Sequence, residues 1–169
     1  MHMSKPATDL KFNVAQLLRE YIGAWRRYDF AEPVLPLDGP IEMRDLTGQV
    51  RFTRTASGVL VDARARGTVT LECIRCLNPA MQAIEVSFRD EFHSRIDVNT
   101  GMPLPKPDED DPFFLDELHL ADVGEALREY SLLELPMQPL CRPDCRGLCP
   151  TCGTDLNVEQ CSCAETSVD

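Results

Sequence analysis

Ile84-Glu85-Val86-Ser87-Phe88-Arg89-Asp90-Glu91-Phe92 alternates apolar and polar side chains at every position except Asp90. A period of two is typical of a β-strand that packs one face and exposes the other. Residues 50–54 and 59–66 alternate in the same way, and Ser57-Gly58 between them is a credible hairpin turn. We therefore predict an antiparallel sheet over residues 41 to 95.

Two short helices are expected on either side of this sheet. Asn13 is an N-cap candidate, and the residues after it predict a helix over 13–22. A second helix is predicted over 121–133, where apolar side chains recur at helical spacing and Asp122 stands near the start. Three prolines between the first helix and the sheet predict a loop there; they are Pro33, Pro36 and Pro40.

The chain has 169 residues, of which 43% are hydrophobic and 27% charged, as expected for a globular protein with one main domain. We predict an α+β domain over residues 1–140, a zinc-binding module packed on it over 141–163, and a disordered tail over 164–169. The acidic, proline-rich stretch from about 103 to 112 has little to bury, so we expect a flexible loop there.

Charge is divided unevenly along the chain. The formal net charge is −11. Residues 1–95 hold 13 basic and 12 acidic side chains, whereas residues 96–169 hold 4 and 16. This balance argues against a general nucleic-acid binder, so any RNA contact is expected from the first half. No stretch approaches the roughly 18 consecutive apolar residues of a membrane span, and we expect a cytoplasmic protein without a membrane contact.

Eight cysteines give the strongest chemical signal, because they occur in close pairs. In a reducing compartment such pairs favour metal binding over disulfides, and a tetrahedral Zn²⁺ takes four thiolates. We expect two zinc ions, each held by four thiolates. The candidate ligands are Cys73, Cys76, Cys141, Cys145, Cys149, Cys152, Cys161 and Cys163.

Two groupings of these ligands are compatible with the spacing. The first joins Cys73 and Cys76 with the pair at 141 and 145, and the last four cysteines form the other site. The second places 141, 145, 149 and 152 on one ion, and 73, 76, 161 and 163 on the other. We rank the first grouping higher, because four ligands within twelve residues leave little room for the chain to reverse.

Other chemistry at the cysteines is less well supported. An iron–sulfur cluster and a redox dithiol are the main alternatives, although no thioredoxin-like βαβ pattern surrounds either Cys-x2-Cys pair. Catalytic zinc needs an open coordination position and a general base, which complete four-thiolate sets lack. His93 and His119 have no partners at ligand spacing, so we expect them to be surface or hydrogen-bonded residues.

The cysteine motifs resemble those of the YceD family, the large ribosomal RNA subunit accumulation proteins. The resemblance is carried by Leu71-Glu72-Cys73-Ile74-Arg75-Cys76, by Leu135-Pro136-Met137, and by the stretch from Leu140 to Asn157 that contains Cys149-Pro150-Thr151-Cys152-Gly153. It implies a non-enzymatic role in the accumulation of large-subunit ribosomal RNA, with no catalytic residue and no small-molecule substrate. The implied partner is that RNA or a large-subunit ribosomal protein.

The alternative from another class is a zinc-stabilised adaptor that binds a basic ribosomal protein through its acidic second half.

Several arginines are candidates for RNA contact. Aromatic and basic residues interleave between 21 and 30, which suits base stacking and phosphate contact but also ordinary helix packing. Other arginines recur along the predicted strands, where cross-strand pairing with acidic residues is the plainer interpretation. The RNA-contact candidates are Arg26, Arg27, Arg64, Arg66 and Arg75.

Overall fold

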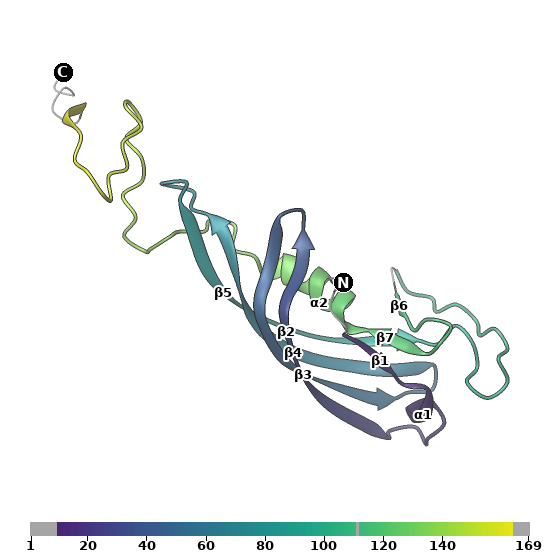
Figure 1. Cartoon of the computed structure of the whole chain (residues 1–169). Helices are drawn as coiled ribbons and strands as arrows, with labels where there is room; N and C mark the ends of the chain where they lie inside the picture. The colour runs from purple at the N-terminus through teal and green to yellow at the C-terminus, as the bar shows by residue number, and fades with distance from the viewer. Residues whose placement is uncertain (1–9, 111, 164–169) are drawn as a thin grey trace, which may run out of the picture.

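The computed structural model describes residues 10–110 and 112–163. The predicted tail at 164–169 lies outside the described residues. Within them, four long strands form an antiparallel meander in which each strand pairs with the next. These strands are β2 (Trp25–Asp38), β3 (Ile41–Arg54), β4 (Gly58–Glu72) and β5 (Pro79–His93), and the short β6 (Phe113–Phe114) adds to β5 in parallel (Figure 1).

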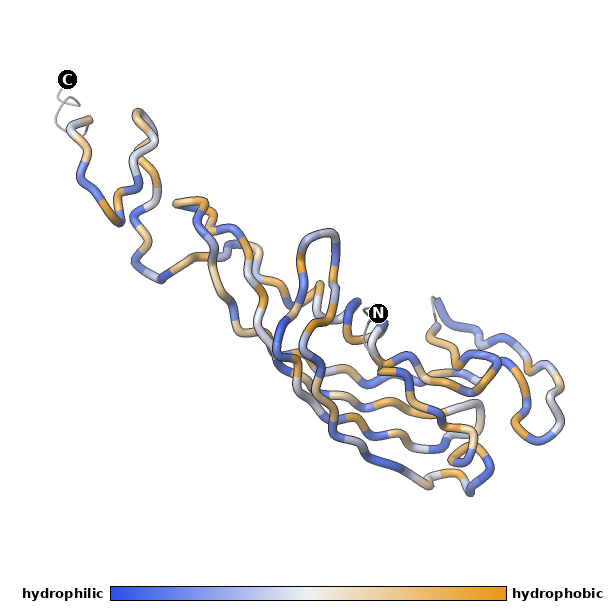
Figure 2. The backbone as a smooth tube through the Cα atoms, in the orientation of Figure 1, coloured by the Kyte–Doolittle hydropathy of each residue, from blue (hydrophilic) through white to orange (hydrophobic). Residues whose placement is uncertain are grey.

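The predicted α+β class with an antiparallel sheet and two helices is confirmed. Apolar and polar residues alternate along the strands, as the colours of Figure 2 show. On β5, Ile84, Val86 and Phe88 are buried, whereas Glu85 and Ser87 between them are exposed. We call the face that carries the buried residues the inner face, and the opposite one the outer face.

The inner face is covered by the remaining elements. Helix α2 (Val123–Glu134) lies over it and contacts both β5 and β2. Its Tyr130 ring stacks on Phe88 with 4.9 Å between the ring centroids, and Arg128 Nη1 donates to the carbonyl of Leu37 at 3.2 Å. A small second sheet, β1 (Lys11–Asn13) with β7 (Leu120–Asp122), completes the cover with helix α1 (Ala15–Leu18).

Helix α2 agrees with the prediction over 121–133, and Asp122 is its N-cap. The Asp122 side chain accepts a hydrogen bond from the backbone N–H of Glu125 at 3.0 Å.

The predicted helix over 13–22 is wrong in length, because α1 has only four residues. Leu17 and Leu18 are its buried side chains, whereas Tyr21 and Ile22 are 77% and 67% exposed. A helix gains most of its stability from packing an apolar face, and here that face ends after one turn.

The predicted loop around Pro33 and Pro36 is also wrong, because both prolines lie inside β2. Proline cannot donate to a β-ladder and is tolerated on an edge strand. Among the strands of residues 10–110 and 112–163, β2 is at the edge of the sheet and pairs with β3 alone. The sheet therefore begins at Trp25 and not at 41.

A β-bulge adjusts the alternation on β3. Asp45 has a φ of 52°, and the β3–β4 register shifts between Arg44 and Thr47. The extra residue lets Met43 and Leu46, three positions apart, both lie buried in the core.

The acidic stretch is free of helix and strand over the described residues 104–110. Its flexibility remains a prediction.

Candidate metal centres

The first cysteine cluster joins the tip of the β4–β5 hairpin to the segment after α2. Cys73 and Cys76 lie in the turn between the strands, where Cys73 N–H donates to the carbonyl of Asn78 at 2.9 Å. Cys141 and Cys145 come from the C-terminal segment, which Figure 1 shows extending beyond this end of the sheet. Cys73, Cys76 and Cys145 are at most 3% exposed.

Backbone and side-chain hydrogen bonds hold the two parts of this cluster together. The backbone N–H of Ile74 donates to the carbonyl of Pro139 at 3.0 Å, and Arg75 Nη1 donates to the carbonyl of Cys145 at 2.9 Å. Gly147 has a φ of 77°, and a Cβ there would lie 3.1 Å from the carbonyl oxygen of Arg75. The C-terminal segment thus approaches the hairpin tip closely at a position that favours glycine.

The second cluster lies within the C-terminal segment itself and contains Cys149, Cys152, Cys161 and Cys163. The N–H of Cys149 donates to the carbonyl of Thr154 at 2.8 Å, and Gly153 N–H donates back to the carbonyl of Cys149 at 2.9 Å. Cys149 is buried, whereas Cys152 is exposed and the last two cysteines are partly exposed.

The sulfur atoms gather as in the first of the two predicted groupings, with Cys73 and Cys76 beside Cys141 and Cys145 and with the last four cysteines in the other cluster. Within each set of four, the sulfur atoms all lie within 4.8 Å of one another. The Sγ atoms of Cys73 and Cys145 are 3.8 Å apart, and those of Cys76 and Cys141 are 3.5 Å apart. Four ligands at about 2.3 Å from one tetrahedral ion lie roughly 3.8 Å from each other. The donor sets therefore fit a single Zn²⁺ each, and none of the eight cysteines, all of which lie within the described residues, forms a disulfide.

The first cysteine of each Cys-x2-Cys turn has a lowered pKa, which favours its thiolate form. Burial raises the pKa of Cys73, but backbone N–H groups, that of Cys76 foremost, donate to its sulfur and lower its pKa to about 6. The backbone N–H groups of Cys152 and Thr151 lower the pKa of Cys149 to about 6 in the same way. Thiolates are the form that binds metal.

The pKa values of Cys141 and Cys163 shift in the opposite direction. Contact with the Cys76 thiol and burial raise the pKa of Cys141 to about 12, and contact with Cys152 does the same for Cys163. Four thiolates at these distances repel one another unless a cation lies between them. Metal binding at either cluster would therefore release protons.

The structure separates the five arginines predicted to contact RNA. Arg27, Arg64 and Arg66 are exposed on the outer face of the sheet. Arg26 is the neighbour of Arg27 on a strand and forms an ion pair with Glu20 instead. Arg75 donates a hydrogen bond to the Cys145 carbonyl, and this bond joins the hairpin tip to the C-terminal segment.

His93 has a partner that its spacing in the sequence did not indicate. It is 5% exposed, and its Nε2 lies 3.2 Å from Glu109 Oε2 of the acidic stretch. Glu91 lies close to both side chains. The contact depends on how that stretch folds back, which the sequence pattern does not reveal.

No helix among the described residues is long and apolar enough to cross a membrane.

The fold and the clusters define a class of protein. Its members have a small antiparallel sheet, and the tip of one hairpin and the C-terminal segment together form a four-cysteine site. The chain belongs to the family described as Large ribosomal RNA subunit accumulation protein YceD, which matches residues 61–169. That range contains all eight cysteines, and the resemblance found from the sequence motifs is confirmed.

Curated relatives come from bacteria and plants. An uncharacterized protein of Mycobacterium tuberculosis is 34% identical over 113 residues, which cover 65% of this chain and 51% of the relative. A protein of Zea mays named Large ribosomal RNA subunit accumulation protein YCED homolog 1, chloroplastic, is 28% identical over 142 residues, or 70% of this chain and 48% of the relative. The chain thus spans about half the length of the curated relatives it matches. No solved structure matches the chain.

Proposed function

We propose that this chain is a non-enzymatic factor that supports the accumulation of large-subunit ribosomal RNA and contains two structural zinc ions. The observation that carries the proposal is the pair of complete four-cysteine clusters within the region that matches the family. The family description and the name of the maize relative supply the link to large-subunit RNA.

The proposed zinc ions stabilise the fold and take no part in a reaction. Four thiolates fill a tetrahedral shell and leave no position for a substrate or a water molecule. The first ion would join residues 73 and 76 of the proposed domain 1–140 to the proposed module 141–163. The second would order the end of that module. A reducing compartment such as the cytoplasm suits this proposal, because it keeps the thiols reduced.

The metal content is tested by native mass spectrometry of the purified chain. We expect two Zn²⁺ per chain and their loss in acid. A chain that binds iron in place of zinc, or no metal at all, would contradict the zinc assignment. Neither result would contradict the proposed ribosomal role.

The ribosomal role is tested by deletion of the gene in its own organism. We expect the ratio of large-subunit to small-subunit ribosomal RNA to fall, and to recover when the wild-type chain is expressed again. An unchanged ratio after deletion would sink the proposal. The partner, large-subunit RNA or a large-subunit protein, is distinguished by whether association with the large subunit is sensitive to ribonuclease.

A second candidate is an adaptor for a basic protein. One observation favours it, a hollow of about 310 Å³ beside α2 and the acidic stretch, lined by Asp90, Glu91, Glu109, Asp110 and Glu129 among others. Capture of a purified basic ribosomal protein without RNA, abolished by salt, would favour this adaptor over an RNA contact.

A further inference from the structure

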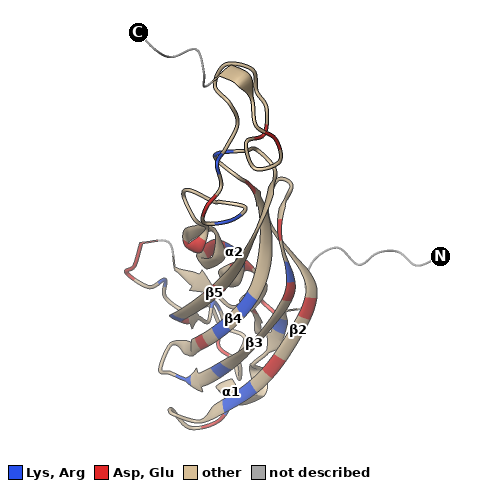
Figure 3. Cartoon of the chain, turned by 90° about the vertical axis from the view of Figure 1, so that its left-hand side faces the viewer, with Lys and Arg blue, Asp and Glu red and all other residues tan. Residues whose placement is uncertain are grey.

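The outer face of the sheet carries a group of arginines that take no part in the two cysteine clusters. We call it the arginine face and define it by Arg27 of β2, Arg51 of β3, Arg64 and Arg66 of β4, and Arg89 of β5. All five side chains belong to exposed residues. Figure 3 shows basic positions on neighbouring strands, with acidic positions between them.

The strand register brings these arginines together. Arg27 pairs with Arg51, Arg51 with Asp62, and Asp62 with Arg89, so that one row crosses four strands. The next row along β4 contains Arg64, beside Gln49 and Ser87, and the one after it contains Arg66. Neighbouring strands lie about 4.8 Å apart, and alternate residues on a strand roughly 6.7 Å apart. The five guanidinium groups therefore extend from one continuous surface.

These arginines lack the acidic partners that other arginines of the chain have. Arg26 pairs with Glu20, Arg44 with Glu42, and Arg128 with Glu125. No residue of 10–110 or 112–163 forms an ion pair or hydrogen bond with any guanidinium of the arginine face. Four carboxylates lie on the same face by the strand register, those of Asp29, Asp62, Glu85 and Glu91, so basic and acidic side chains nearly balance there. Asp29 accepts from Gln49, and Glu91 from Thr55. The five guanidinium groups themselves form no ion pair with the described residues and are available to an anionic partner.

An aromatic side chain stands at one end of the arginine face. The Arg51 guanidinium lies 4.6 Å from the centroid of the Trp25 ring, and Trp25 is 50% exposed. An exposed indole beside guanidinium groups offers both stacking for bases and contacts for phosphates.

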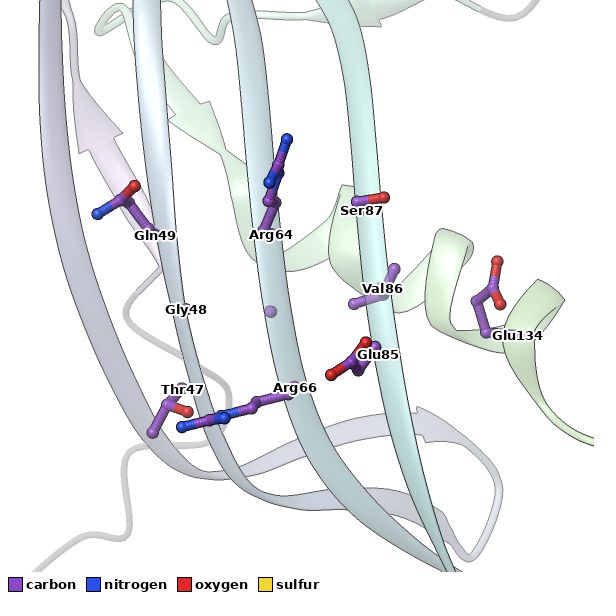
Figure 4. A pocket seen from close by; sticks show the side chains of 10 residues that line it. Thr47, Gly48, Gln49, Arg64, Arg66, Glu85, Val86, Ser87 and Glu134 are labelled. Carbon is purple, nitrogen blue, oxygen red and sulfur yellow. The ribbon is translucent and has the colours of Figure 1, made fainter.

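Arg64 and Arg66 border an open hollow of about 770 Å³ on the same face. Thr47, Gln49 and Ser87 line it as well, and Figure 4 shows Arg66 extending across β3 toward Thr47. The carboxylates of Glu85 and Glu134 also border the hollow. Hydroxyl, amide and guanidinium groups are the side chains that most often contact the sugar–phosphate backbone. The hollow therefore places neutral hydrogen-bonding groups beside the guanidinium groups of Arg64 and Arg66.

We propose that the arginine face binds single-stranded RNA through its phosphates, with Trp25 stacking on a base. This deepens and rests on the proposed function, because it names the surface through which the chain would contact ribosomal RNA. An RNA strand fits better than an acidic protein, since planar guanidinium groups match phosphate oxygens and an exposed indole suits bases. The acidic second half of the chain would repel RNA and restrict binding to this face.

The test uses the metal-loaded full chain and a labelled single-stranded RNA of about 20 nucleotides, a length that exceeds the site of one small sheet module. Binding is followed by fluorescence anisotropy at several salt concentrations. For Arg64→Gln/Arg66→Gln we expect a loss in affinity of about 10-fold or more and a shallower salt dependence, because each lost phosphate contact removes about one unit of salt slope.

The matched control is Arg19→Gln/Arg146→Gln, which removes the same charge at exposed positions outside the arginine face. We expect its affinity to stay within about 2-fold of wild type, because neither arginine lies on the proposed RNA surface. Both variants lose the same net charge, so a difference between them reports the arginine face itself. Circular dichroism confirms that both variants fold. Equal losses in the two variants, or tighter binding of a poly-glutamate peptide than of RNA, would overturn the proposal.

Trp25 provides an independent readout, because it is the one tryptophan in the sequence. We expect RNA to quench its fluorescence in the wild type, and Arg27→Gln/Arg51→Gln to weaken the quenching. Binding without any change at Trp25 would place the RNA elsewhere and overturn the proposal. These assays use purified protein, so failure here is distinct from an unchanged RNA ratio after gene deletion, which concerns the proposed function.

Discussion

At the scale of the residue, Tyr130 shows how one polar atom is held between helix and sheet. Its ring stacks on Phe88, and its hydroxyl donates to Asp90 on β5. The neighbouring carboxylate disfavours the phenolate and raises the pKa of Tyr130 to about 12. The hydroxyl therefore stabilises the folded state only while it keeps its proton.

For Tyr130→Phe we expect the free energy of unfolding at pH 7 to fall by about 1 kcal/mol, the usual contribution of one such hydrogen bond. The folded pKa lies above the unfolded value of about 10, so the advantage of the wild type is complete below that pH and declines as pH rises toward 12. Urea unfolding at both pH values measures it. Tyr21→Phe, at an exposed position, is the control and should change nothing; a wild-type advantage that persists undiminished at pH 12 would contradict the assignment.

The residues of the candidate site differ in how far the sequence predicts them. The cysteines are predictable because ligands of one ion occur in pairs, and the sulfur groups follow the preferred pairing. The arginine face was predicted only in part. Arg64 and Arg66 share a face through simple alternation, but Arg89 joins them through the strand register, which depends on tertiary pairing.

At the scale of the element, β2 shows where sequence patterns fail. Its prolines predicted a loop, yet they are accommodated because the strand lies at the sheet edge. Edge position is a property of the whole sheet and not of the local sequence. Alternation predicted a part of each of the strands β3 to β5, over 50–54, 59–66 and 84–92. It did not reveal the bulge at Asp45, where the β3–β4 register shifts.

Helix α2 depends on its N-cap, because Asp122 satisfies the backbone N–H of Glu125. For Asp122→Ala we expect a loss of about 1 kcal/mol in the free energy of unfolding, as is typical when a helix loses its cap. Thermal and urea unfolding measure it. Glu117→Ala, an exposed carboxylate just before β7, serves as the control. A loss no larger than that of the control would show that the cap is dispensable.

At the scale of the whole molecule, two separate groups of buried residues support the fold. The main core lies between the inner face of the sheet and the elements that cover it, and it contains no cysteine. The second group is small and consists of Cys73, Cys76, Ala80 and Cys145. So few apolar contacts cannot order a long C-terminal segment alone, which explains why metal would be needed there.

Loss of the first cluster would separate the C-terminal segment from the hairpin tip, whereas loss of the second would loosen only the end of that segment. In the metal-loaded chain we expect Cys73→Ser to lower the melting temperature more than Cys161→Ser. Cys73 is fully buried and joins the hairpin tip to the C-terminal segment, whereas Cys161 is partly exposed near the end of the chain. Differential scanning calorimetry measures both variants, with metal content determined on the same samples. Equal shifts would show that the first cluster does not join the two parts.

Removal of metal from the wild type tests the same division across the whole chain. Because the main core excludes the cysteines, we expect a chelator to leave β2 to β5 folded and to release residues 139–163. Hydrogen exchange should then accelerate in that segment and at the 73–78 turn, while amides paired between β3 and β4 stay protected. Re-addition of Zn²⁺ should restore protection, with Mg²⁺ as the control, since hard cations bind thiolates poorly. If the chelated chain loses protection throughout the sheet, the bound metal stabilises the entire fold. If it keeps full protection at 139–163, hydrogen bonds such as that from Arg75 to Cys145 hold the segment without metal.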